Sequence, residues 1–164
     1  MRLADRLHFV PLDSARAASY ADWMEGATGS AGLVYTDIFN LGKYRKVLFV
    51  IQMGAGATGT GVVTVESCDT VVPGTPTAIA YNYKVCTTLD VFGDWTEATS
   101  AGFTTTAGAN ACYLIEVDAS ELSTTDQFIR LKVTEATDSP TDGCILTILG
   151  DARIMLENPI TAIV

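Results

Sequence analysis

Short runs of alternating apolar and polar residues are the feature that most constrains the fold of this 164-residue chain. In the clearest run, residues 127–134, three aliphatic side chains alternate with Arg130 and Lys132. Successive side chains of a β-strand point to opposite faces, so this period of two predicts a half-buried strand. Similar runs cover residues 79–86 and 113–118.

Other segments are apolar on both faces. Residues 47–53 predict a central strand covered on both sides, 144–149 predict a further buried strand, and 33–39 predict an early strand. About seven or eight short strands without a convincing helix between them predict an all-β chain, an antiparallel two-sheet sandwich. Jelly-roll and immunoglobulin-like sandwiches both fit. We expect a jelly-roll-like form, because Trp95 lies too near Cys86 and Cys112 for the immunoglobulin pattern.

The first 26 residues differ from the rest, so we divide the chain into an N-terminal segment, 1–26, and a β-sandwich domain, 27–164. Asp13 is a suitable cap for a short helix, although residues 1–12 fit an extended arm equally well. This segment either covers an edge strand of its own domain or docks on a neighbouring subunit. The candidate assembly contacts in it are His8, Phe9, Val10, Leu12, Tyr20 and Trp23.

A Gly54-x-Gly56-x-x-Gly59 spacing follows the predicted central strand and matches a dinucleotide-binding fingerprint. Such a fingerprint holds a pyrophosphate only if a helix follows the glycines. Residues 62–67 contain three valines and a threonine, which favour an extended chain. We therefore expect a β-hairpin that joins two antiparallel strands, and no nucleotide cofactor.

Charge excludes some classes of partner. The chain has 10 basic and 19 acidic residues, a net charge of −9, and no long basic cluster. Nucleic acid and anionic membranes are therefore not expected as partners. The longest apolar run, residues 47–51, is far below a membrane span, and the N-terminus lacks the apolar core of a signal peptide. We expect a soluble protein made in a cytoplasm.

The histidine and cysteines do not form a recognisable metal site. His8 is the only histidine, and the four cysteines, spaced by 18, 26 and 32 residues, contain no CxxC pair. Without an export signal, the thiols are expected to be free and to pack inside strands. A disulfide between neighbouring strands remains open.

No catalytic constellation emerges from the sequence. A Ser–His–Asp or Cys–His arrangement has only His8 to use, and no Gly-x-Ser-x-Gly elbow is present. Glu116 and Asp118 share one face of a predicted strand, about 7 Å apart, and we interpret them as a solvated face. Three further acids, Asp138, Asp142 and Asp151, lack the spacing of an EF-hand calcium site. We expect no enzyme activity, no metal and no cofactor.

Four stretches that span most of the chain are "LHFVPLDSA", "KYRKVLFVIQMGAG", "CYLIEVDASELSTTDQFIRLKVTEA" and "ILGDARIM". Together they resemble small β-sandwich virion proteins of tailed bacteriophages. Particular cues are the strand–helical turn–strand phrase "IEVDASEL…QFIRLKVTEA" and the late "LGDAR". The resemblance brings no catalytic residues with it.

This resemblance implies a structural role in the virion. It points to a head decoration (cement) protein, made in the host cytoplasm, that binds the outer capsid lattice. Its partners would be the major capsid protein and copies of itself, as a homo-oligomer on the particle. A tail or connector component is a close alternative. An alternative of another class is a carbohydrate-binding module that uses Trp95, Phe92 and Phe103 as aromatic platforms.

Overall fold

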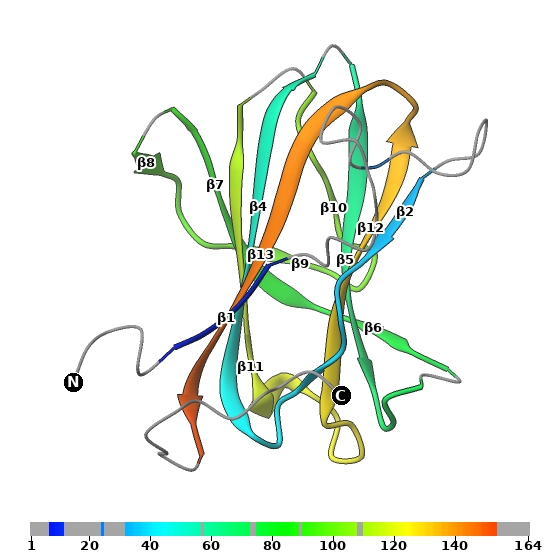
Figure 1. Ribbon diagram of the computed structural model, residues 1–164, viewed down its shortest axis with the longest axis vertical. Helices are drawn as coiled ribbons and strands as arrows, with labels where there is room; N and C mark the ends of the chain where they lie inside the picture. The colour runs from blue at the N-terminus through cyan, green and yellow to red at the C-terminus, as the bar shows by residue number, and fades with distance from the viewer. Residues whose placement is uncertain are drawn as a thin grey trace.

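The chain folds into two antiparallel β-sheets packed face to face, as the computed structural model in Figure 1 shows. The predicted all-β sandwich is therefore confirmed. The structure describes residues 7–11, 24, 32–56, 58–72, 75–88, 90–107 and 110–153. The described elements are β1 (His8–Pro11), β2 (Leu33–Tyr35), β3 (Phe39–Asn40), β4 (Tyr44–Gly56), β5 (Thr60–Cys68), β6 (Thr77–Ile79), β7 (Tyr81–Thr88), β8 (Val91–Phe92), β9 (Thr96–Ala98), β10 (Phe103–Thr104), β11 (Cys112–Asp118), the 3₁₀ turn η2 (Ala119–Glu121), β12 (Phe128–Thr137) and β13 (Thr141–Ala152).

The strands are divided between two sheets, which we name A and B. Over the described residues, sheet A has the order β1-β13-β4-β11-β7-β8, with β9 also paired to β7. Sheet B has the order β10-β5-β12-β2, with β3 paired to β12 and β6 paired to β5. The long strands pair in a nested order, β4 with β13, β5 with β12 and β7 with β11. The nested pairs thus alternate between the two sheets of the sandwich.

The inward-facing residues of both sheets form one hydrophobic core. Ile51 in sheet A and Ile129 in sheet B are fully buried, and burial of such a side chain contributes about 1.5–3 kcal/mol. The predicted alternation of residues 113–118 and 127–134 is confirmed, because the odd-numbered residues from 113 to 117 and from 129 to 133 lie in this core.

The glycines from Gly54 to Gly59 do not form the predicted hairpin. Gly54 and Gly56 belong to the end of β4 in sheet A, and the next strand, β5, lies in sheet B. The chain therefore crosses between the sheets after Gly56, although a strand does follow the glycines as expected. A Cβ on Gly61 would lie 2.7 Å from both Met24 Sδ and Val133 Cγ1. One on Gly59 would overlap Thr141 Oγ1. Gly59 and Gly61 thus allow neighbouring residues to pack closely where the chain enters β5.

The apolar runs in β4 and β13 are buried on one face and not on both, contrary to the prediction. Leu48 and Val50 of β4 are only partly buried and lie opposite the core-facing side of their strand. The same holds for Leu146 and Ile148 of β13. The two-layer architecture explains the difference, because each sheet of a sandwich packs on the shared core with one face only.

The predicted strand at residues 33–39 is interrupted between β2 and β3. Thr36 lies at the break, and its hydroxyl oxygen accepts a 2.9 Å hydrogen bond from the backbone N–H of Leu131. This side-chain oxygen takes the place of a backbone acceptor, so the regular ladder stops there. None of the helical segments in the described ranges is long and apolar enough to cross a membrane.

Candidate functional site

The N-terminal candidate contacts have different surroundings. His8, Phe9 and Val10 belong to β1, which pairs with the last strand, β13. Leu12, Tyr20 and Trp23 lie outside the described residues. Residues 8–11 therefore cover an edge of their own sheet, as one of the two sequence interpretations proposed.

Within β1 the side chains divide between the two faces. Val10 is buried in the core, whereas Phe9 is 46% exposed. The half-buried ring of His8 lies 5.9 Å from the ring of Tyr44, measured between centroids, and burial lowers the pKa of His8. Only Phe9 of these three residues presents a largely open apolar side chain.

Phe9 continues an apolar surface that spans four strands of sheet A. The register aligns Phe9 with Ile148 and Ile148 with Leu48. A second row aligns Leu146, Val50 and Leu114. We call these six residues the apolar outer face; they are Phe9, Leu48, Val50, Leu114, Leu146 and Ile148. Phe9 is exposed and the other five residues are partly buried. Apolar side chains gathered on the outside of a sheet are candidates for contact with another molecule.

The outer face of sheet B is polar. Arg130 Nη2 lies 2.6 Å from Glu66 Oε2, and Lys132 Nζ lies 3.2 Å from Glu66 Oε1. The guanidinium of Arg130 also lies over the ring of Tyr35, 4.1 Å from its centroid. These charges are largely buried, because the side chains of Arg130 and Glu66 are 15% and 8% exposed. The outer face of sheet A also carries an ion pair, between Lys46 and Glu116, which lies beside its six apolar residues.

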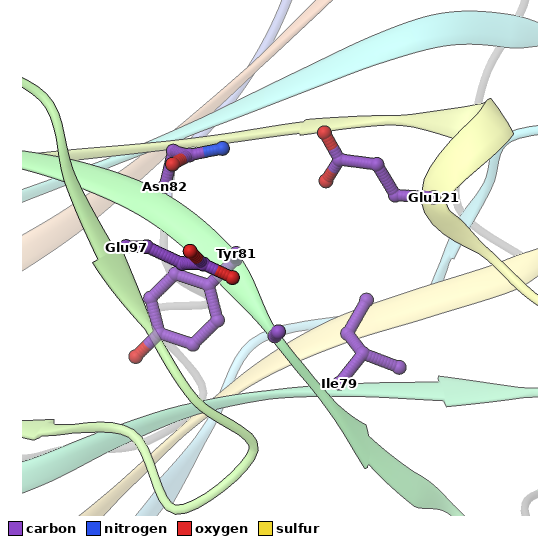
Figure 2. A pocket seen from close by; sticks show the side chains of 6 residues that line it. Ile79, Tyr81, Asn82, Glu97 and Glu121 are labelled. Carbon is purple, nitrogen blue, oxygen red and sulfur yellow. The ribbon is translucent and has the colours of Figure 1, made fainter.

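A hollow lies beside the apolar outer face, where β7 and β9 meet the η2 turn. Asn82, Trp95, Glu116 and Glu121 line about 320 Å³ of it. An adjoining part of about 410 Å³ shares Asn82 and Glu121 and is also lined by Ile79, Ala80, Tyr81 and Glu97. Figure 2 shows the side chains of Asn82 and Glu121 pointing toward one another across this adjoining part. We refer to the whole as the β7–η2 hollow.

Two carboxylates in and beside the β7–η2 hollow have shifted pKa values. Burial, and after it the negative charge of Asp118, raises the pKa of Glu121. Asp118 itself accepts hydrogen bonds from the Ser120 backbone N–H and hydroxyl, which lower the pKa of its carboxyl. Lys84 Nζ lies 4.9 Å from the centroid of the Trp95 ring, which is 47% exposed. The hollow thus combines an open indole, an amide and carboxylates.

The two acids that share one face of β11 form ion pairs with β4. Glu116 Oε1 lies 2.9 Å from Lys46 Nζ, and Asp118 Oδ2 lies 3.3 Å from Arg45 Nε. These contacts agree with the interpretation of this face as solvated. Sequence reasoning missed Asn82, Glu97 and Glu121, because strand pairing brings them together and no local spacing shows it.

The three expected aromatic platforms have different surroundings. Phe103 packs against the core and stacks on Tyr83, with ring centroids 4.1 Å apart, so its place as a platform was predicted wrongly. Trp95 and Phe92 are exposed as expected. Trp95 alone of the three lines the described hollow.

The cysteines are free thiols. Cys68 and Cys86 are buried, Cys112 is half-buried and Cys144 is exposed. Among the residues that the structure describes, no three His, Cys, Asp or Glu side chains are grouped as a metal would require.

Comparison of the chain with protein-family models, with curated proteins and with solved structures finds no match in any of the three.

Proposed function

We propose that this chain is a non-enzymatic structural protein of a phage particle, a capsid decoration protein that binds and stabilises the outer capsid lattice. The sequence resemblance suggests the class, and the apolar outer face of sheet A is the observation that supports an assembly role. Its partners would be the major capsid protein and further copies of the chain.

The aliphatic part of the outer face of sheet A supports this role. Aliphatic residues of β4, β11 and β13 are partly buried there and gather beside the exposed Phe9. The outer face of sheet B instead carries Glu66, Arg130 and Lys132, which pair with one another. Removal of apolar area from water stabilises a contact by roughly 25 cal/mol per Å², so a partner that covers the aliphatic residues gains stability from this effect.

A lattice makes weak contacts sufficient. Many identical copies bind a capsid at once, and links between neighbours raise the effective concentration of each. Homo-oligomers around symmetry axes suit such a surface. The net charge of −9 opposes non-specific association between free copies before assembly.

The first experiment counts this chain against the major capsid protein in purified particles by quantitative mass spectrometry. Near-stoichiometric abundance supports decoration of the lattice. A few copies per particle would contradict it in favour of a tail or connector component, and absence would reject a virion role.

A matched pair of variants tests the face itself. Val50→Lys and Leu146→Lys place a charge on the apolar outer face, whereas Thr134→Lys places the same charge on the outer side of β12 in sheet B. We expect the first two to bind particles about tenfold more weakly or worse, and Thr134→Lys to bind normally. All three must show native circular dichroism. Normal binding by both folded sheet A variants would reject this face as the contact.

A carbohydrate-binding module is the second candidate, favoured by the β7–η2 hollow. Sugar sites combine an aromatic ring with a few polar groups that fix orientation, and Trp95, Asn82 and Glu121 supply both. A glycan array with the wild-type chain and Trp95→Ala tests this candidate, with Phe92→Ala as the control for an exposed aromatic outside the described hollow. Binding that is lost only in Trp95→Ala would support it. No binding by the wild-type chain would reject it.

A further inference from the structure

Three cysteines lie in one row across sheet A. The register places Cys86 of β7 directly opposite Cys112 of β11, Cys112 opposite Gln52 of β4, and Gln52 opposite Cys144 of β13. The residues on both sides of Gln52 and of Cys112 are buried in the core, so this row lies on the outer side of the sheet. Cys86 and Cys112 are the two cysteines of the row that are immediate neighbours.

We propose that Cys86 and Cys112 are an oxidation site, at which a small-molecule disulfide converts the two thiols into a reversible cross-strand disulfide. This inference does not depend on the proposed role in a virion.

The backbone pattern fixes the separation of the pair. Met53 N–H donates to Ala111 O across β4 and β11 at 2.8 Å, so Cys112, one residue on, directs its own N–H and C=O toward β7. Gly93 N–H donates to Val85 O at 3.0 Å, so the backbone polar groups of Val85 point away from β11. The backbone polar groups of successive residues alternate in direction along a strand, so those of Cys86 point toward β11.

Cys86 and Cys112 are thus a hydrogen-bonded pair, whose Cα atoms lie about 5.5 Å apart in a regular antiparallel ladder. Disulfides span Cα separations of about 4.4–6.8 Å, so the bond can form. Cβ atoms of such pairs are about 4.5–5.5 Å apart, against about 3.8 Å in an unstrained disulfide. Bond formation must draw the strands together locally, so the disulfide is more easily reduced than a structural one.

Exposure decides which thiol reacts first. Cys112 is half-buried, whereas Cys86 is 8% exposed and its thiol donates to the Thr88 carbonyl oxygen at 3.0 Å. Burial raises the pKa of Cys112, and the neighbouring Cys86 and Cys144 add to this increase. Cys112 is therefore the accessible attacking group, and its reaction speeds up as pH rises.

The chemistry balances with a disulfide such as oxidised glutathione. The Cys112 thiolate attacks one sulfur of glutathione disulfide, a mixed disulfide forms, and one glutathione thiolate leaves. The Cys86 thiolate then attacks the Cys112 sulfur and expels the second glutathione. The protein loses two protons and two electrons, and the oxidant is reduced to two glutathione thiols.

Cys144 provides the matched control. It lies two strands from Cys112, with β4 between them, and two strand spacings are about 9.5 Å. That separation exceeds the reach of a disulfide. Cys144 can take up glutathione at its exposed thiol but has no facing cysteine in the row with which to exchange it.

The disulfide would restrain the segment of sheet A that includes part of the β7–η2 hollow. Residues 86–112 include β8, β9 and β10, and Trp95 lies within this loop. Closure of the loop restricts the unfolded chain, so the oxidised protein should unfold at a higher temperature than the reduced protein.

The test equilibrates the reduced full-length chain with glutathione buffers of increasing oxidised fraction, followed by denaturation, alkylation and non-reducing peptide mapping. We expect a Cys86–Cys112 linked peptide in the wild type and equally in Cys144→Ser. In Cys86→Ser, Cys112 should keep bound glutathione, because no thiol remains to expel it.

Two outcomes would overturn the proposal. One is four alkylatable thiols in the wild-type chain at the most oxidising ratio. The other is a linked peptide that contains Cys144 in place of Cys86. Near-native circular dichroism of Cys86→Ser is required, and Cys86→Ala is the substitute if the serine variant unfolds.

Discussion

The carboxylate of Glu135 accepts a 2.7 Å hydrogen bond from the backbone N–H of Gly32, a residue 103 positions earlier in the chain. The backbone N–H of Glu135 in turn donates to the Gly32 carbonyl oxygen at 2.8 Å. Glu135 is 5% exposed, and its second oxygen has no hydrogen-bond partner among the described residues. This reciprocal contact fastens the chain just before β2 to the end of β12.

Removal of the Glu135 side chain should destabilise the fold. Glu135→Ala leaves the Gly32 N–H without its acceptor in a buried site, which should lower the free energy of unfolding by about 1–3 kcal/mol. Glu135→Gln keeps a carbonyl acceptor of similar size and removes a buried charge, so its loss should be smaller. Urea denaturation of the three proteins compares them. An equal loss in both variants would show that the Gly32 contact is not what matters.

Gly102 should tolerate no side chain. Its φ is +77°, and a Cβ there would overlap the carbonyl oxygen of Val63. Gly102→Ala should therefore lower the free energy of unfolding by at least about 1 kcal/mol. Gly93→Ala is the control, because a Cβ at Gly93 meets only Val85 O at 3.6 Å. Thermal unfolding should separate the two variants, and equal midpoints would contradict this account.

The two ion-pair sites of the outer faces should differ in strength. The side chain of Glu66 is 8% exposed and lies against Arg130 and Lys132, whereas those of Glu116 and Lys46 are 41% and 43% exposed. Glu66→Gln leaves Arg130 poorly compensated and should cost about 3–5 kcal/mol at most. Glu116→Gln should cost about 0–1 kcal/mol. Denaturation in low and high salt measures both, and a larger loss in Glu116→Gln would refute the ranking.

His8 should make the fold weakly sensitive to pH. Burial lowers its pKa below the ordinary value of 6.5, so the native state favours the neutral ring. As pH falls below 6.5, the unfolded chain takes up the proton first, and this contribution to stability is lost as pH passes through the folded pKa. His8→Gln should remove that part of the pH dependence.

NMR titration of the single histidine measures this pKa directly. A midpoint at or above 6.5 in the folded protein would contradict the assignment.

Local sequence patterns predicted the strands well. Residues 113–118 and 127–134 alternate as predicted, because a side chain's face depends only on its position along its own strand. The valines after Gly59 predicted β5, and no helix follows the glycines. These features depend on sterics and hydrophobicity within a few residues.

Local sequence patterns could not show which strands pair with one another. The hairpin predicted around Gly54 does not form, because β4 extends to Gly56 and β5 then pairs in the other sheet with β12, from far along the chain. The row of Cys86 and Cys112 and the hollow around Asn82 and Glu121 likewise exist only after β7 pairs with β11.

The sequence by itself determined an acidic all-β chain, the approximate positions of its long strands and the apolar side of those strands that alternate, such as residues 127–134. Only the tertiary structure decided which of the two apolar faces of β4 meets the core and which, through Leu48 and Val50, faces outward. The reason is physical. A strand that is apolar on both faces can bury either face in the core. Long-range pairing of β4 with β11 and β13 decides which face is buried.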